Sequence, residues 1–244
     1  MSTPEPVTAL ATRTIGRTVF RQGWRDLTFL HWPVDPARVA PLLPAGTHPD
    51  TYDGAAWIGL VPFRMVRIGV LSAPGLPYLG TFCETNVRTY SVDGQGRRGV
   101  VFLSLDAARL APVVVGRATG LPYLWSRMRI TRAHDGAVAY TSRRRWPGPR
   151  GATSRIVVRP GEPVSCGPLE QFLTARWGLH TTSRGRTVYW PNEHEQWPLR
   201  AASVAALDDQ LLAAVGFGDL TGTAPASVLF SPGVEARFGP RLRA

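Results

Sequence analysis

Turn signals divide this chain into many short segments, and that spacing limits what it can fold into. Asp-Gly pairs occur at residues 53–54, 93–94 and 135–136, and the chain holds 25 glycines and 22 prolines. The segments between the turns are short, apolar and rich in aromatic and β-branched residues, which favours strands over long helices. Hairpins without a regular alternation of strand and helix predict an antiparallel, strand-dominated α+β fold.

The predicted elements follow from these turns and from local periodicity. Strands are predicted over residues 24–32, 55–63, 78–92, 98–104, 126–132, 137–145, 155–158, 187–190 and 227–231. Helices are predicted over residues 36–43, 106–120, 169–177 and 207–215, and a loop over residues 74–77. Residues 1–20 are expected to form a flexible lead-in, and residues 21–244 a single domain, because no convincing linker interrupts them.

Composition places the chain among ordinary globular proteins. Its 244 residues are 44% hydrophobic and 18% charged, which suffices for a substantial core. Two cysteines are too few for a disulfide framework, and residues 1–20 lack the apolar stretch of a secretory signal. No segment approaches the roughly 20 apolar residues that span a bilayer. We therefore expect a cytoplasmic protein that does not associate with membranes.

The chain contains no lysine, so all 28 of its basic side chains are arginines. A guanidinium group stays protonated and cannot act as an amine nucleophile. No Schiff base to a side-chain amine can form, which excludes imine-based decarboxylation, aldol chemistry and anchoring of pyridoxal phosphate. A genome rich in GC codons, which encode arginine in place of lysine, accounts for the bias.

The formal net charge of +11 is unevenly distributed. Residues 126–159 contain nine arginines and one acid, Asp135, so this segment carries +8 of the total. Such a band could meet nucleic acid, an anionic ligand or an acidic protein, or it could be a solvated pair of strands. We do not expect nucleic acid as the partner, because only Tyr140 and Trp146 are available nearby for stacking.

Known catalytic motifs are absent or misplaced. Residues 94–99 match G-x-G-x-x-G, but a strand rather than a helix is predicted after them, so they are interpreted as a hairpin turn. The chain has no G-x-S-x-G elbow and no Walker loop. Its five histidines lie far apart, without the spacing of metal ligands. We therefore predict neither a metal nor a cofactor.

The most informative segment is the strand around residues 81–91. Alternation places residues 83, 85, 87 and 89 on one face and Phe82, Glu84, Asn86, Arg88 and Tyr90 on the other. A carboxylate, an amide, a guanidinium and a phenol between aromatic rings is an unusual set for one strand face. The face could simply be exposed to solvent. If it points into a closed sheet instead, it lines a ligand cavity, and we favour that interpretation.

Several stretches resemble a known family. They cover residues 29–34, 50–59, 61–63, 84–90 and 102–107, and the similarity extends over residues 24–230. Together they resemble the uncharacterised DUF2071 (YqjF-like) family, which is similar to the acetoacetate decarboxylase superfamily. This resemblance implies a cone-like closed antiparallel barrel with a central cavity, to whose walls Trp57 and Phe63 are assigned. It also makes self-association into a homo-oligomer plausible.

The resemblance breaks where decarboxylases carry their reactive amine. Glu84 looks like the pocket glutamate of that superfamily, and residues 116–123 look like the run that ends in its Schiff-base lysine. Here that place holds Tyr123, and Leu124 stands where the superfamily has a second lysine. Decarboxylation by the Schiff-base route is therefore ruled out, while the implied cavity remains.

The residues suggest two uses for such a cavity. In the first, Arg88 binds the carboxylate of a small organic acid, Glu84 acts as acid or base, and Tyr123 hydrogen-bonds a carbonyl. That arrangement suits a lyase or isomerase without a Schiff base, for example in isomerisation, hydration or dehydration. In the second, the protein is a non-catalytic sensor of the same molecule. The sequence does not decide between them.

A structural explanation of the same pair is that Glu84 and Arg88 neutralise each other. Residues four apart on a strand have Cα atoms about 13 Å apart, which is too far for an easy contact along the strand. That distance favours a separate partner for each side chain, and a bound ligand is one such partner.

Overall fold

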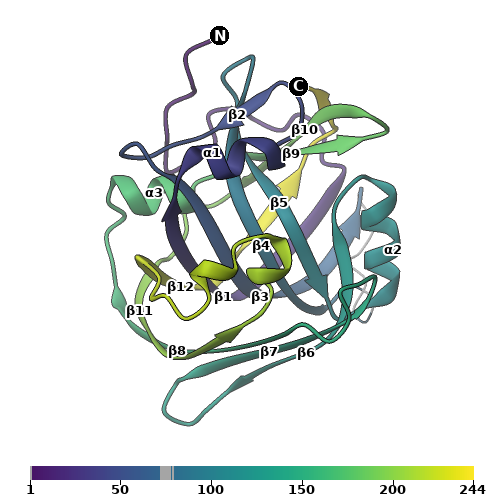
Figure 1. Ribbon diagram of the computed structural model, residues 1–244. Coiled ribbons are helices and arrows are strands. Elements are labelled where there is room, and N and C mark those ends of the chain that lie inside the picture. The colour runs from purple at the N-terminus through teal and green to yellow at the C-terminus, as the bar shows by residue number, and fades with distance from the viewer. Residues whose placement is uncertain (1, 72–77, 79) are drawn as a thin grey trace.

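Strand pairs, all antiparallel except one, wind around the molecule and close into a ring (Figure 1). The computed structural model describes residues 2–71, 78 and 80–244. Each strand of the ring pairs with the next, and the last pairs with the first, in the order β4 (Phe82–Asp93), β5 (Arg98–Ala107), β6 (Tyr123–Arg132), β7 (Val138–Trp146), β8 (Thr153–Pro163), β11 (Arg200–Asp209), β12 (Ser227–Phe238), β1 (Phe20–Val34) and β3 (Ala56–Val70). Within this ring, the pair β5–β6 is the parallel one.

The remaining elements close the ends of this ring. A parallel contact joins β5 to β9 (Gly178–Ser183), which pairs with β10 (Arg186–His194) and through it with β12. Short strands β2 (Thr47–Pro49) and β13 (Leu242–Arg243) lie at the edges. The helical elements are α1 (Pro36–Val39), α2 (Leu110–Ala118), α3 (Pro168–Thr174) and the 3₁₀ turns η1 (Ala40–Leu42), η2 (Ala213–Val215) and η3 (Gly218–Leu220). This is the strand-dominated α+β fold that the turn spacing predicts.

Glycine turns connect the strands where the Asp-Gly pairs predict them. Asp53 and Gly54 have φ angles of 51° and 76°, the left-handed pair of a tight turn, and Tyr52 bridges to Ala55 across it. The glycine-rich run at residues 94–99 turns β4 into β5, with Gly96 at a φ of 82°. A strand therefore follows these glycines, and they are not a dinucleotide-binding loop.

Two segments predicted as helices both begin as strand. The segment 106–120 begins as strand, because β5 continues to Ala107 and only residues 110–118 are helical. The segment 207–215 also begins as strand, since β11 runs to Asp209 and a 3₁₀ turn follows. In both places a neighbouring strand takes the backbone hydrogen bonds: Asp106 lies opposite Thr85, and Leu207 opposite Ile156.

Other boundaries differ less. Strand β4 begins at Phe82 rather than at residue 78, and β9 was not predicted at all. The predicted loop over residues 74–77, and residue 79, lie outside the described residues. The proposed lead-in touches the body, because the Glu5 amide donates to the Gly96 carbonyl at 2.8 Å and Val7 packs against the core. Among the described residues, no helix has the length and apolar character needed to cross a membrane.

Alternate residues of β1 and β3 pack into different apolar layers. Leu30 and Leu60 belong to a cluster with Phe217, on the side of the sheet covered by the η2–η3 segment. Phe29 and Phe63 belong to a second cluster with side chains such as Phe82, Val113 and Trp197. Both faces of these strands are therefore buried. The face that carries Phe63 and the second cluster also lines the cavity inside the ring.

Candidate binding and active site

The polar face of β4 lines an enclosed cavity of about 110 Å³. Holding one water requires roughly 10–15 Å³ of such space, so the cavity can take several waters or a compact organic molecule. Apolar side chains including Trp24, Val61, Phe63 and Trp197 form much of its wall. Its polar lining consists of Gln22, Glu84, Asn86, Arg88, Tyr123, Thr174, Arg176, Asn192 and His194. The inward orientation predicted for residues 84, 86 and 88 therefore holds.

A hydrogen bond joins Glu84 of β4 to Tyr123 of β6. The Tyr123 hydroxyl donates to Glu84 Oε2 at 3.0 Å, and only 3% of Glu84 is exposed. Tyr123 is the first residue of β6, and its ring lies against α2, where a Cβ on Gly116 would come within 2.2 Å of it. Glycine at position 116 thus lets the helix approach the ring and fix its position.

Burial makes the Glu84 carboxyl a weak acid. Burial is the main cause of a Glu84 pKa of about 8; the hydrogen bond from Tyr123 acts against it, and the charge of Asp106 adds a smaller upward contribution. Burial, followed by the Glu84 charge, also holds the pKa of Tyr123 well above its ordinary value. At neutral pH the pair is therefore a mostly protonated carboxylic acid beside a neutral phenol, able to give or take one proton.

Arg88 brings a positive charge to the same cavity. One of its terminal nitrogens donates to the Leu173 carbonyl at 3.1 Å, at the end of α3, while its Nε is buried without a hydrogen-bond partner. Its guanidinium lies 5.4 Å from the centre of the Phe29 ring. Within residues 2–71, 78 and 80–244, neither Arg88 nor Glu84 forms an ion pair. The two therefore do not neutralise each other, and the guanidinium keeps donors for an anion.

Two amides add unused acceptors. Asn86 lies between Glu84 and Arg88 on β4 and is 4% exposed. Asn192 lines the same cavity from β10, a strand far from β4 in the sequence. The side-chain oxygen of each is buried and has no hydrogen-bond partner among the residues that the structure describes. Buried polar atoms are nearly always hydrogen-bonded, so these two indicate a ligand or ordered water in the cavity.

Three predicted site residues do not line the cavity. Phe82 packs in the apolar cluster with Phe63, and Trp57 packs beside Tyr90 and Phe172. Tyr90 lies on the predicted face, but α3 covers it, and its hydroxyl donates to the Leu173 carbonyl at 2.7 Å. Arg88 donates to the same carbonyl, so Tyr90 and Arg88 share one backbone partner at the end of α3.

Sequence reasoning missed a histidine in the cavity wall. His194 ends β10, and its Nδ1 lies 2.6 Å from the Glu195 carbonyl, which can only accept, so Nδ1 carries the proton. Burial lowers the pKa of His194 to about 4, so the ring is neutral and its Nε2 is an acceptor. The strand predicted over residues 187–190 continues to residue 194. Alternate residues of that longer strand share one face, which would have placed His194 beside Asn192.

The cavity offers no obvious place for a metal. Throughout the part of the chain that the structure describes, no cluster of three or more His, Cys, Asp or Glu side chains has the arrangement of a metal site. The cavity's titratable lining consists of Glu84, Tyr123, His194 and two arginines, a set suited to an organic ligand.

The arginine-rich band of residues 126–159 lies away from this cavity, on β6, β7 and β8. Arg144 is buried and holds Asp106 through bonds of 3.0 and 2.7 Å, while Arg132 and Arg159 pair with Asp26 and Asp135. Others project outward and are exposed: residues 127, 129, 143, 145 and 155.

The ring of strands has the acetoacetate decarboxylase-like fold. An acetoacetate decarboxylase-like enzyme from Sphingomonas wittichii RW1 superposes with a TM-score of 0.64 at 14% identity, over 96% of this chain and 95% of that one. The enduracididine biosynthesis enzyme MppR, solved in complex with pyruvate, gives a TM-score of 0.59 at 15% identity, over 96% and 92%.

Sequence comparison then places the chain within a family. The model of the DUF2071 family, described as an uncharacterized conserved protein, matches residues 21–235. The uncharacterized protein YqjF of Bacillus subtilis (strain 168) is 35% identical over 191 residues, which is 77% of each chain. The protein belongs to the DUF2071 family.

Proposed function

We propose that the cavity binds a compact organic acid and that Glu84 and Tyr123 carry out acid–base chemistry on its carbonyl group. The observation that supports this most is the buried, protonated carboxyl of Glu84 in the same cavity as a guanidinium with unused donors. A charged group in an apolar enclosure is costly unless an opposite charge joins it, and a ligand carboxylate would supply that charge.

The positions of these groups suggest how such a ligand would lie. Arg88 holds the carboxylate at one end, the Asn86 amide contacts its middle, and the Glu84–Tyr123 pair meets the carbonyl at the other end. Glu84 and Arg88 are four residues apart on one strand, so their Cα atoms lie about 13 Å apart. Both side chains line the cavity. MppR, a structural neighbour, binds pyruvate, which supports a keto acid of this size.

The chemistry needs no amine. Protonated Glu84 can give its proton to a carbonyl oxygen or to a departing hydroxyl group, and the resulting carboxylate can take a proton from the neighbouring carbon. Tyr123 stays neutral and stabilises the developing oxyanion by donating a hydrogen bond. Isomerisation, hydration and dehydration of a carbonyl compound all fit this exchange, and imine formation does not, since the chain has no lysine.

The first experiment measures ligand-induced shifts in melting temperature against a panel of small keto and hydroxy acids. We expect a shift for the wild-type protein that Arg88→Met abolishes, because the carboxylate loses its counter-charge. Arg127→Met is the matched control, since it removes the same charge from an exposed site on β6 and should leave the shift unchanged. If the shift survives both Arg88→Met and Glu84→Gln, the cavity is not the binding site.

Turnover separates the enzyme from the sensor. The ligands that shift the melting temperature are incubated with wild type, Glu84→Gln and Tyr123→Phe, and products are followed by NMR. Conversion that Glu84→Gln lowers by roughly 10²–10⁴-fold, with binding retained, identifies Glu84 as the acid or base. Binding without conversion of any ligand by the wild-type protein would instead assign a non-catalytic sensor.

A further inference from the structure

Four arginines surround a surface basin that lies outside the cavity described above. Arg184 and Arg186 come from the hairpin between β9 and β10, and Arg241 and Arg243 come from the segment around β13. The basin encloses about 540 Å³, within the range of small-molecule sites, and shares none of its lining residues with the first cavity. The side chains of Ser183 and Thr187 add hydroxyl groups to its lining.

These positive charges are not neutralised from within the protein. All four arginines are exposed, and in the described ranges none of them forms an ion pair and no acidic side chain lines the basin. Some exposed arginines elsewhere do form ion pairs, as Arg132 does with Asp26. Four like charges around one concave surface repel one another and raise the local concentration of anions.

The hairpin holds one of these arginines at a conformational cost. Arg184 and Gly185 form its two-residue turn, with φ angles of 51° and 72°, and Ser183 pairs with Arg186 across it. The first position of such a turn favours Asn, Asp or Gly, and the same chain uses Asp53 in the equivalent place of another turn. An arginine adopts this left-handed backbone less readily than Asn, Asp or Gly. A cation at this tip therefore costs stability that an Asp or Asn would not.

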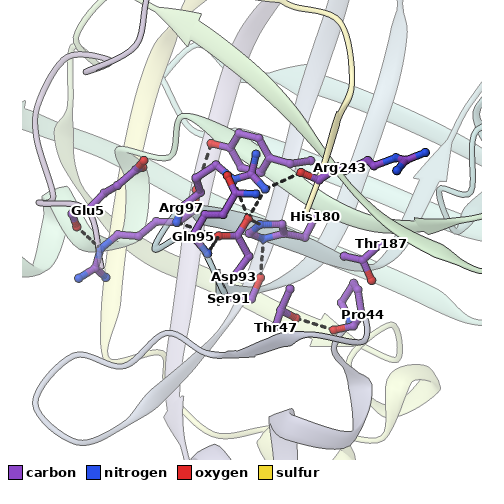
Figure 2. Close-up of polar contacts among 12 residues, drawn as sticks. Glu5, Pro44, Thr47, Ser91, Asp93, Gln95, Arg97, His180, Thr187 and Arg243 are labelled. Atoms are coloured by element: carbon purple, nitrogen blue, oxygen red, sulfur yellow. Dashed lines mark hydrogen bonds and ion pairs between the residues drawn. The ribbon is translucent and has the colours of Figure 1, made fainter. Parts of the chain in front are cut away.

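A buried network holds the other side of the basin in place. Arg97 donates to the backbone carbonyl of Arg243 at 2.7 Å and through its Nε to Asp93 at 2.6 Å. His180 lies between Asp93 and Ser91, with its nitrogens 3.3 and 2.8 Å from their oxygens. Figure 2 shows this network and the Arg243 side chain, which extends away from it.

The network itself is not a catalytic site. Ser91, His180 and Asp93 are each at most 1% exposed, so no substrate reaches the serine hydroxyl. Its effect is positional: it fixes the β13 backbone, which also pairs with β10 through Val188 and Arg243. The backbones of the two arginine-bearing segments are thereby held side by side, which keeps their side chains around one basin.

We propose that this basin binds a compact anion with two or more phosphate groups. Guanidinium groups bind phosphate oxygens through paired hydrogen bonds, and four of them match a ligand with several negative charges better than a single phosphate. The basin is concave and bounded, which favours a small oligophosphate over a long nucleic acid. The outward face of β6–β8 carries a comparable number of exposed arginines, Arg129 and Arg155 among them, and it provides the internal comparison.

The test measures binding of inorganic tripolyphosphate to the full chain by calorimetry at low salt. We expect the double variant Arg186→Gln/Arg243→Gln to bind at least tenfold more weakly. The matched control, Arg129→Gln/Arg155→Gln, removes the same charge from the outward face of β6–β8 and should retain wild-type affinity. Melting temperatures of all variants verify that they fold, which exposed substitutions should allow.

Each other outcome overturns the proposal. Equal weakening in both double variants would mean that only the net charge attracts the anion. Binding of monophosphate as tight as that of tripolyphosphate would mean that the four arginines do not act together. Binding of a random single-stranded RNA, with no binding of tripolyphosphate, would assign a nucleic acid surface instead.

Discussion

At the scale of single residues, Glu84 should make stability depend on pH. Its folded pKa of about 8 lies above its ordinary value of 4.5, so between these values the unfolded chain ionises while the folded protein stays protonated. The wild-type protein therefore loses stability as pH rises through this window. Glu84→Gln removes that loss, and the free energy of unfolding of the variant relative to wild type should increase by roughly 3–5 kcal/mol between pH 4.5 and pH 8. Urea unfolding at several pH values measures this difference, and a constant difference would mean that Glu84 is ionised inside the protein.

At the scale of secondary structure, one buried ion pair ties three consecutive strands. Asp106 of β5 accepts from Arg144 of β7 and from the Ser126 hydroxyl of β6 at 2.6 Å, and neither charged side chain is more than 3% exposed. Arg144→Met should cost about 3–5 kcal/mol of stability, because it leaves a buried carboxylate without its counter-charge. The double variant Asp106→Asn/Arg144→Met should recover much of that loss, since no buried charge remains. Chemical denaturation of both variants checks this, and equal losses in the two would show that packing rather than charge dominates.

At the scale of the whole molecule, the net charge of +11 should act against folding. Repulsion among the exposed arginines favours the expanded chain, and salt screens it over about 10 Å at 0.1 M ionic strength. We expect the melting temperature to rise by a few degrees between 0.02 and 0.3 M sodium chloride, a gain of about 1 kcal/mol. Calorimetry in a buffer without phosphate measures this, so that the arginine basin does not contribute. A fall in melting temperature would mean that the surface ion pairs contribute more than the repulsion.

The sequence by itself determined the type of fold and one wall of the cavity. Turn residues such as Asp53 and Gly54 require left-handed backbone, and strict alternation along residues 82–90 fixes which side chains share a face; both are local properties. The absence of lysine likewise excludes a Schiff base to any side-chain amine.

Only the tertiary structure decided the rest, because it depends on contacts between distant segments. Pairing with β8 made residues 207–209 a strand where local spacing predicts a helix, and α3 removed Tyr90 from the cavity by covering it. His194 enters the cavity, and Arg243 joins Arg184 around the basin, only because strands far apart in sequence lie side by side. The proton on Glu84 has the same origin: burial that the whole ring creates holds it there, and no pattern within β4 specifies it.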